Sequence, residues 1–221
     1  STQAKTLFPY TTLFRSVIDD YDKTNIGSPM PKFTFGWTNT FRYKNFDLSV
    51  FINGSYGNKV YNYLSMKLTH MNSPWTNQLN AVNGRAQLVP INPNKVYEDG
   101  TMWYNDVSNV MVANPGASIP RATINDPNDN DRISDRYIED GSYIRLKNIS
   151  LGYTFPKKTI DKLGLSNLRI YANIQNLLTI TGYDGYDPEI GASTSSVNVY
   201  GLDNGRYPSP TVYSFGLNVS F

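Results

Sequence analysis

The last twelve residues of the chain, 210–221, constrain its fold most, because they alternate strictly between two kinds of side chain. Successive side chains of an extended strand point to opposite faces. One face of this segment carries Thr211, Tyr213, Phe215, Leu217, Val219 and Phe221, and the other carries Val212, Ser214, Gly216, Asn218 and Ser220. A transmembrane β-barrel requires strands of about ten residues with one apolar and one polar face. The segment therefore predicts a barrel strand.

The composition of the 221-residue chain shows why a hydropathy scan would overlook such strands. Charged residues make up only 17% of the chain, yet its mean hydropathy is -0.43, so uncharged polar side chains carry its polarity. No apolar run approaches the ~20 residues of a membrane helix, whereas the 17 Tyr and 10 Phe suit strands and membrane interfaces. The net charge of +2 gives no indication of nucleic acid as a partner. The lack of cysteine excludes disulfides and thiolate metal sites.

Two further segments, residues 31–43 and 46–57, alternate in the same way and predict their own pairing. Their apolar positions are Phe33, Phe35, Trp37, Phe41 and Tyr43, then Phe46, Leu48, Val50, Ile52 and Tyr56. Only two residues separate the segments, and a two-residue hairpin pairs Tyr43 with Phe46, which places both apolar sets on one face. Phe51 interrupts the polar face, and the pattern offers no reason for it beyond a contact in the lumen or with the plug.

Two more strands are expected at residues 143–155 and 168–179. In the first of these the apolar residues change phase, and a β-bulge near Lys147 and Asn148 would bring them onto one face. Pro156 ends that strand, and residues 157–167 predict a short helical turn that closes at Gly164. The chain between the strands forms two long loops, at residues 58–142 and 180–209, with a short helix expected at 62–70.

Several segments carry a combination of residues that resembles one protein family. They are residues 138–153 (IEDGSYIRLKNISLGY), 175–178 (QNLL), 185–189 (GYDPE) and the hairpin at 41–57. In order and spacing, this set closely resembles the SusC/RagA family of TonB-dependent outer-membrane transporters, and the resemblance extends over residues 17–221. It marks the following positions as a structural or loop motif: Glu139, Asp140, Gly141, Ser142, Tyr143, Arg145, Lys147, Asn148, Asn176, Gly185, Asp187, Pro188 and Glu189.

The resemblance implies an all-β fold, in which this chain supplies about five strands of an antiparallel transmembrane barrel of about 22 strands. A C-terminal fragment is then expected, with a signal peptide, a TonB-contacting segment and a plug domain upstream. Residues 1–16 match nothing expected there, and we interpret them as an artefact or a disordered stretch; the alternative is an ordinary strand through residues 7–14. The final strand resembles the barrel-assembly signal, at Ser214, Gly216, Val219 and Phe221.

The implied function is TonB-dependent import of glycans, oligosaccharides or peptides across the bacterial outer membrane. The implied partners are a SusD-like surface lipoprotein, the TonB complex, the barrel assembly machinery and outer-membrane lipids, with no nucleic acid and no catalysis. If the hairpin at residues 44–45 is a periplasmic turn, both long loops are extracellular. The alternative is a soluble β-sandwich that binds carbohydrate, which would need a second sheet to cover the apolar faces.

Other candidate residues are weighed against simpler roles. The carboxylates of Asp187 and Glu189 invite comparison with a glycosidase, but the glycines and proline around them favour a turn. The acidic residues Asp19, Asp20 and Asp22 could end a calcium loop, but the first half of the calcium-loop pattern is absent, which favours a solvated loop. No other cofactor is expected. The lone His70 lacks the neighbours of a metal site.

The sequence leaves two interpretations open for the cations of the polar face and two for the aromatic residues of the first long loop. The cations expected on or near the polar face could pair with acids of the plug or of neighbouring strands, or they could contact cargo: Arg42, Arg145, Lys147 and Arg169. The aromatic residues of the first long loop could stack on cargo or cover a lipoprotein lid, or they could form the loop's own core: Trp75, Tyr97, Trp103 and Tyr104.

Overall fold

The computed structural model describes residues 23–124, 126, 129–190 and 200–221. The expectations for residues 1–16 and for the acidic residues at positions 19, 20 and 22 lie outside the described residues. The chain divides into two compact units. One consists of Gly27–Tyr61 and Glu139–Phe221, and the other contains Asn62–Ile138. We call the first the sheet unit and the second the inserted unit.

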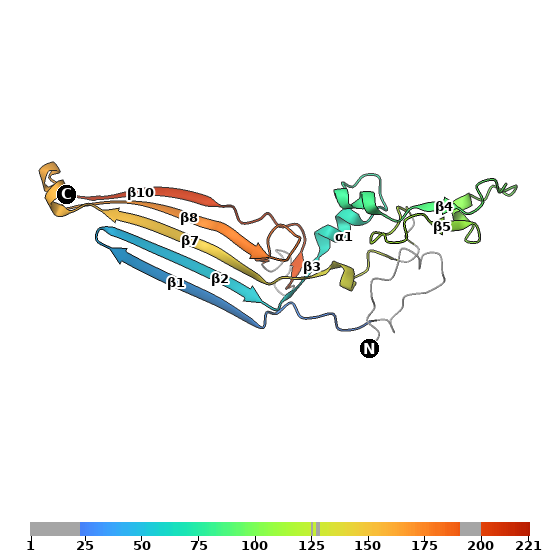
Figure 1. Ribbon diagram of the computed structural model, residues 1–221, viewed down its shortest axis with the longest axis horizontal. Coiled ribbons are helices and arrows are strands. Elements are labelled where there is room, and N and C mark those ends of the chain that lie inside the picture. The colour runs from blue at the N-terminus through green and yellow to red at the C-terminus, as the bar shows by residue number, and fades with distance from the viewer. Residues whose placement is uncertain (1–22, 125, 127–128, 191–199) are drawn as a thin grey trace. The chain divides into compact units, whose positions relative to one another are not determined.

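The sheet unit is built on five antiparallel strands that lie side by side (Figure 1). In the order β1-β2-β7-β8-β10, they are Phe33–Tyr43, Phe46–Tyr56, Tyr143–Thr154, Asn167–Thr181 and Val212–Ser220. Each strand is hydrogen-bonded to the next along this order, and the first and last strands form open edges of the described sheet. This open sheet is the all-β barrel segment that the sequence predicts.

The register of the sheet follows from the first hairpin. Tyr43 pairs with Phe46, which confirms the pairing expected from a two-residue turn. Lys44, the first residue of that turn, has a positive φ of 53°. From there, every second pair along β1 and β2 lies on one face, and most of these pairs join two apolar residues, such as Trp37 with Ile52; the exceptions are Asn39 with Val50 and Phe35 with Gly54. The sheet therefore has an apolar face and a polar face, as the alternation predicts.

The expected β-bulge lies at Lys147. Phe51 of β2 pairs with Asn148 of β7, but the next residue, Ile52, pairs with Leu146, so Lys147 has no partner in this ladder. The pairing of β7 with β8 shifts at the same place. The extra residue changes the phase of the strand, and apolar residues from both sides of the bulge thus share the apolar face: Ile144, Leu146, Ile149 and Leu151.

The structure also accounts for Phe51, the one large apolar residue on the polar face of β2. A Cβ atom added to Gly36 of β1 would lie 3.3 Å from the Phe51 ring. The ring therefore lies beside a position without a side chain on the neighbouring strand. An aromatic ring that covers a strand glycine in this way restores packing that the glycine lacks.

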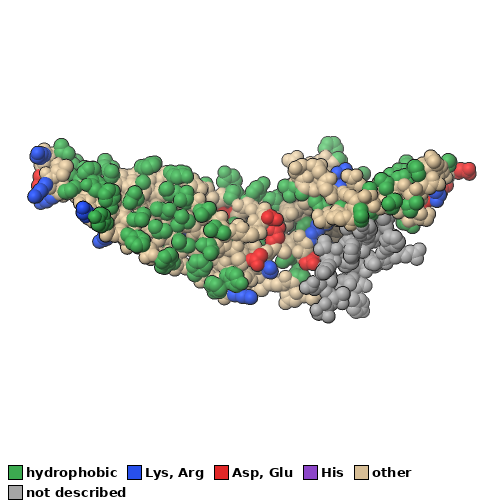
Figure 2. Space-filling view, in the orientation of Figure 1, with side chains coloured by type: hydrophobic (Ala, Val, Ile, Leu, Met, Phe, Trp, Pro, Cys, Tyr) green, Lys and Arg blue, Asp and Glu red, His purple; other side chains and the backbone are tan. Residues whose placement is uncertain are grey.

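The apolar face of the sheet is exposed in the described part of the chain. Trp37 is 58% exposed and Phe215 is 83% exposed, and hydrophobic side chains gather over the sheet in Figure 2. The β-sandwich alternative requires a second sheet against this face, and within the described residues of the sheet unit there is none. No helix among the described residues is long and apolar enough to span a membrane.

The two ends of the sheet differ. At one end, which we call the hairpin end, β1 turns into β2, and a helical turn joins β7 to β8. That turn consists of α2 (Lys157–Ile160) and η5 (Asp161–Leu163) and closes at Gly164, with φ 70°, as predicted. At the opposite end, the loop end, a second sheet forms in the order β6-β3-β9 from Ile138–Asp140, Lys59–Asn62 and Leu202–Asp203.

The inserted unit contains short elements around a small core. Asn62 caps α1 (Tyr63–Thr69) by accepting a hydrogen bond from the Ser65 N–H at 2.8 Å, so the expected short helix is present. The strands β4 (Leu88–Pro90) and β5 (Val110–Val112) pair with each other. The described part of this unit also contains three short 3-10 helices: η2 (Asn80–Gly84), η3 (Trp103–Asn105) and η4 (Asp135–Tyr137). The buried apolar residues of this unit are Met66, Ala86, Val110, Val112, Ile119 and Tyr137.

Candidate functional site

The strongest concentration of charged contacts lies at the loop end of the sheet, around Arg145. Its guanidinium donates from Nη2 to Asp187 and from Nη1 to Glu189 Oε2, at 2.6 Å for the second contact. Its Nε donates to Thr179 Oγ1 at 2.9 Å. Lys147 Nζ reaches the same Glu189 oxygen at 2.6 Å. We call the four charged residues, two cations and two carboxylates, the Arg145 cluster.

Local structure explains how two cations of one strand reach the same loop. Arg145 lies on the polar face of β7, and Lys147, two residues further along, shares that face because side chains of a strand alternate. The two halves of the cluster differ in exposure. The side chains of Arg145 and Asp187 are 3% and 11% exposed, whereas those of Lys147 and Glu189 are 31% and 35% exposed. The inner ion pair is thus shielded from solvent far more than the outer pair.

The electrostatics favour a charged Asp187. Burial by itself disfavours ionisation of this carboxyl, but hydrogen bonds from Arg145 and from the backbone N–H groups of Ser209 and Glu189 outweigh it and lower its pKa. The Ser209 contact, at 2.9 Å, ties the last part of the second loop to the same carboxylate. Asp187 therefore joins β7 to two separate parts of the loop.

A second anchor of this loop is a buried pair, Tyr183 and Asp203. The Tyr183 hydroxyl donates to Asp203 Oδ2 at 2.5 Å, and Asp203 Oδ1 accepts from the Gly205 N–H at 2.9 Å. Asp203 is only 2% exposed. Burial and the hydrogen bond to Asp203 raise the pKa of the Tyr183 hydroxyl far above its ordinary value. Sequence reasoning missed both residues, although the Asp-Asn-Gly run at 203–205 is a turn signal.

The two acidic residues at the start of the motif accept hydrogen bonds from backbone N–H groups. Glu139 Oε2 accepts from the Asp184 N–H at 2.9 Å, and Asp140 Oδ1 accepts from the Ser142 N–H at 2.9 Å. The Ser142 hydroxyl oxygen in turn accepts from the Gly57 N–H at 2.9 Å. Both carboxylates therefore order the chain where it enters β7.

The remaining motif residues lie close by. Gly141 lacks room for a Cβ atom, which would lie 2.6 Å from a Val60 methyl carbon. Asn176, with φ 53°, donates from its side chain to the Pro210 carbonyl at 3.1 Å. The others have the following contacts: Tyr143 with the Arg145 guanidinium, Asn148 with Phe51 across the bulge, Pro188 with the Ile190 N–H, and Gly185 with the Tyr183 ring.

A smaller charged group lies at the hairpin end. Arg169 of β8 forms an ion pair with Asp47 of β2 at 2.7 Å, across the intervening strand. Arg42 lies beside Asp47 in the register. Arg169 therefore pairs with an acid of another strand, as one of the two interpretations expects, whereas Arg145 and Lys147 pair with acids of the second long loop.

The aromatic residues of the first long loop occupy different surroundings in the inserted unit. Trp75 is almost fully exposed. The rings of Trp103 and Tyr104 pack edge to face, with centroids 5.7 Å apart. Tyr97 donates its hydroxyl to Asp106 at 2.9 Å and accepts from Asn109 at 3.0 Å, so it belongs to a polar network. Lys95 lies in the same network and, with Ser108 and Tyr97, lowers the pKa of Asp106.

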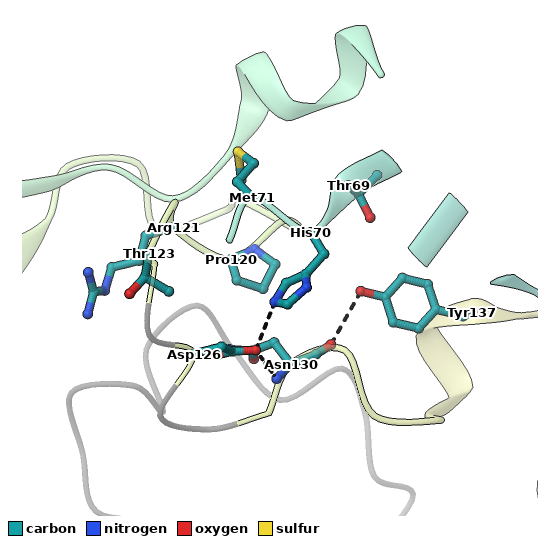
Figure 3. A pocket seen from close by; sticks show the side chains of 9 residues that line it. All are labelled: Thr69, His70, Met71, Pro120, Arg121, Thr123, Asp126, Asn130 and Tyr137. Atoms are coloured by element: carbon teal, nitrogen blue, oxygen red, sulfur yellow. Dashed lines mark hydrogen bonds and ion pairs between the residues drawn. The ribbon is translucent and has the colours of Figure 1, made fainter. Parts of the chain in front are cut away.

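His70 lines a small pocket of the inserted unit (Figure 3). Its Nε2 lies 3.0 Å from Asp126 Oδ2, and the Tyr137 hydroxyl donates to the Asn130 carbonyl at 3.3 Å. No group of three or more side chains suited to a metal ion occurs among the residues that the structure describes. The same Asp126 carboxylate accepts from the Asn130 side chain at 2.6 Å.

Comparison with known proteins gives the chain its context. No family model matches it. It is 35% identical over 209 residues to TonB-dependent receptor P3 of Formosa agariphila, and this match covers 92% of the chain and 18% of the relative. It is 28% identical over 207 residues to TonB-dependent receptor SusC of Bacteroides thetaiotaomicron, with 92% and 16% covered. The chain thus spans less than a fifth of the length of these curated relatives.

A solved structure gives the same context for the fold. The RagAB peptide transporter superposes with a TM-score of 0.63 over 88% of this chain and 18% of that one, at 22% sequence identity. The five-stranded sheet and these similarities define the class: the chain is part of the β-barrel of a TonB-dependent receptor. Within that class, the similarities to SusC and to the RagAB structure agree with the resemblance to the SusC/RagA family.

Proposed function

We propose that the full-length protein to which this chain belongs imports nutrients across the bacterial outer membrane, with energy from TonB. The observation that carries this proposal is the 35% identity to a TonB-dependent receptor over 92% of the chain. The exposed apolar face of the sheet supports a position in the membrane, because strands of an outer-membrane barrel present such a face to lipid.

The cargo class is the finer part of the proposal. We propose oligosaccharides or oligopeptides, since one relative is named SusC and the solved structure with the same fold is a peptide transporter. We further propose that a SusD-like surface lipoprotein works with the barrel. Within this chain, the Arg145 cluster and the Tyr183–Asp203 pair hold the second long loop on the barrel wall, where that loop can contribute to cargo entry.

Uptake by cells that produce the full-length protein tests the proposal. Deletion of the gene should abolish uptake of a labelled oligosaccharide or oligopeptide pool, and re-expression should restore it. A protonophore, which removes the energy that TonB relays, should abolish uptake while cargo still binds to cells. Uptake that continues without the gene or without the energised inner membrane would refute the transport proposal.

Affinity purification of the tagged full-length protein from detergent extracts tests the partner. We expect a surface lipoprotein to copurify in near-equal amount. A barrel that purifies alone under mild detergent, yet supports uptake, would refute the partnership without refuting transport.

A further inference from the structure

On the polar face of the last strand, β10, Gly216 has no side chain, and the ring of Tyr171 from β8 occupies the space beside it. Gly216 of β10 pairs with Tyr171 of β8. A Cβ atom built on Gly216 would overlap the Tyr171 ring, at its Cζ, Cε1 and hydroxyl atoms. The ring therefore occupies the space that a side chain at Gly216 would need. A glycine within a strand ordinarily weakens it, so its presence here calls for a reason.

The same arrangement recurs one strand further along. Tyr171 also pairs with Gly152 of β7, and Gly152 pairs with Asp47 of β2. The Arg169 guanidinium lies 5.2 Å from the Tyr171 ring centroid and reaches over Gly152 to Asp47. A Cβ atom on Gly152 would lie 2.6 Å from Asp47 Oδ1. Two glycines of one row thus make room for two large side chains that lie across neighbouring strands.

The contact between the Tyr171 ring and Gly216 restricts the register of β10 against β8 in a way that the alternation of β10 alone does not. A slip of one residue would turn the apolar face of β10 inward, so alternation excludes it. A slip of two residues keeps every side chain on its own face, and alternation cannot exclude it. Such a slip would place Ser214 or Asn218 under the Tyr171 ring instead of Gly216, and both carry side chains. The ring and the glycine together exclude the two-residue slips.

We infer that Tyr171 is a positioning residue for the last strand, and that the absence of a side chain at Gly216 leaves the space that its ring occupies. The pair selects the register in which β10 joins β8. On this reading the glycine is required for a local fit, whatever the assembly machinery recognises at the end of the chain. The inference concerns assembly and does not depend on which cargo the full-length protein carries.

Compensating substitutions in the full-length protein test the inference. Membrane samples would be compared for the fraction of barrel that keeps its compact mobility in gels until heated. Gly216→Ala should reduce that fraction by roughly tenfold, because a methyl group forced against a packed ring is overpacked. Tyr171→Ala should reduce it less. The double variant should recover to the Tyr171→Ala level, because the ring that the methyl group meets has been removed.

Two controls accompany this series. Gly182→Ala, at a glycine with no neighbouring atom within 4 Å of the added Cβ position, should assemble as the parent protein does. Tyr171→Phe keeps the ring and should also assemble normally. A double variant that assembles no better than Gly216→Ala would overturn the inference, because the glycine would then be needed for a reason other than the ring.

Disulfide trapping measures the register directly. Ser214→Cys with Asn173→Cys joins a pair that is adjacent in the structure, whereas Ser214→Cys with Gln175→Cys joins a pair adjacent only after a two-residue slip. With Tyr171 present, only the first pair should crosslink. In a Tyr171→Ala background the second pair should crosslink as well. If the second pair stays uncrosslinked in that background, Tyr171 does not select the register.

Discussion

The sheet unit and the inserted unit place their apolar side chains in opposite ways. In the five strands, large apolar residues alternate along one face and remain exposed, for example Trp37 and Phe215. In the inserted unit no sustained alternation occurs, yet residues such as Val110 and Val112 are buried in a core of its own. Among the described residues of the sheet unit, the buried apolar ones are Val60, Ile160 and Tyr183, and these lie outside the five strands.

This difference shows which structural property can be inferred from an alternating sequence and which cannot. A period of two identifies which face of a strand is apolar, but it does not tell whether protein or lipid covers that face. A small core that forms from short elements needs no long period, because each element contributes only one or two side chains. Four substitutions, in order of expected effect, test this contrast.

The largest effect is expected on the apolar face of the sheet. Trp37→Arg in the full-length protein should cost about 2–4 kcal/mol, the cost of placing arginine at the centre of the lipid-facing band of a barrel. Thr38→Arg, on the opposite face, is the matched control and should cost much less. The measurement is the heat-resistant folded fraction in membranes. Equal assembly of the two variants would show that the apolar face does not meet lipid.

The next effect is expected in the Arg145 cluster. Removal of one partner of a buried ion pair costs about 3–5 kcal/mol, and we expect Arg145→Gln to cost less than this because Glu189 is partly exposed. The loosened loop should be cut faster by trypsin after the exposed Arg206. Lys147→Gln removes only the outer ion pair and should change the rate little. The cluster does not anchor the loop if both variants are cut at the rate of the parent protein.

A smaller effect is expected in the core of the inserted unit. Val112→Ala removes two methyl groups from a buried side chain and should cost about 1–2 kcal/mol. Met111→Ala, on the exposed side of the same strand, should cost little. Hydrogen exchange should report faster opening of residues 62–138 in Val112→Ala, with barrel assembly unchanged. Loss of barrel assembly in this variant would mean that the two units do not have independent cores.

The smallest effect is a pH dependence that comes from Asp187. Because its pKa in the folded protein is lowered below the ordinary value, the carboxylate stabilises the fold above that ordinary value, near pH ~4. This contribution is lost as the pH falls through the lowered pKa. The Tm of Asp187→Asn should therefore lie below that of the parent protein at pH 7, and the difference should shrink on acidification. A difference that is the same at pH 7 and at pH 3 contradicts this assignment.

Much of the sheet could be predicted from residues close together in the sequence. The hairpin register follows from the two-residue turn, and the bulge at Lys147 follows from the change of apolar phase. The contacts of the candidate site could not be predicted in the same way. Asp187 and Glu189 lie more than forty residues from Arg145, and nothing in their spacing identifies the strand that they meet. The role of Asp203 depends on a tyrosine twenty residues away.

The sequence by itself determined which residues share a face, where the strands turn, and the resemblance to the SusC/RagA family, because side-chain direction in a strand is a local property with a fixed period. The tertiary structure alone decided which cation meets which carboxylate, that the Phe51 ring lies beside Gly36, and that the Tyr171 ring lies over Gly216. Each of these depends on the space between neighbouring strands or loops, and that space exists only after the chain has brought them together.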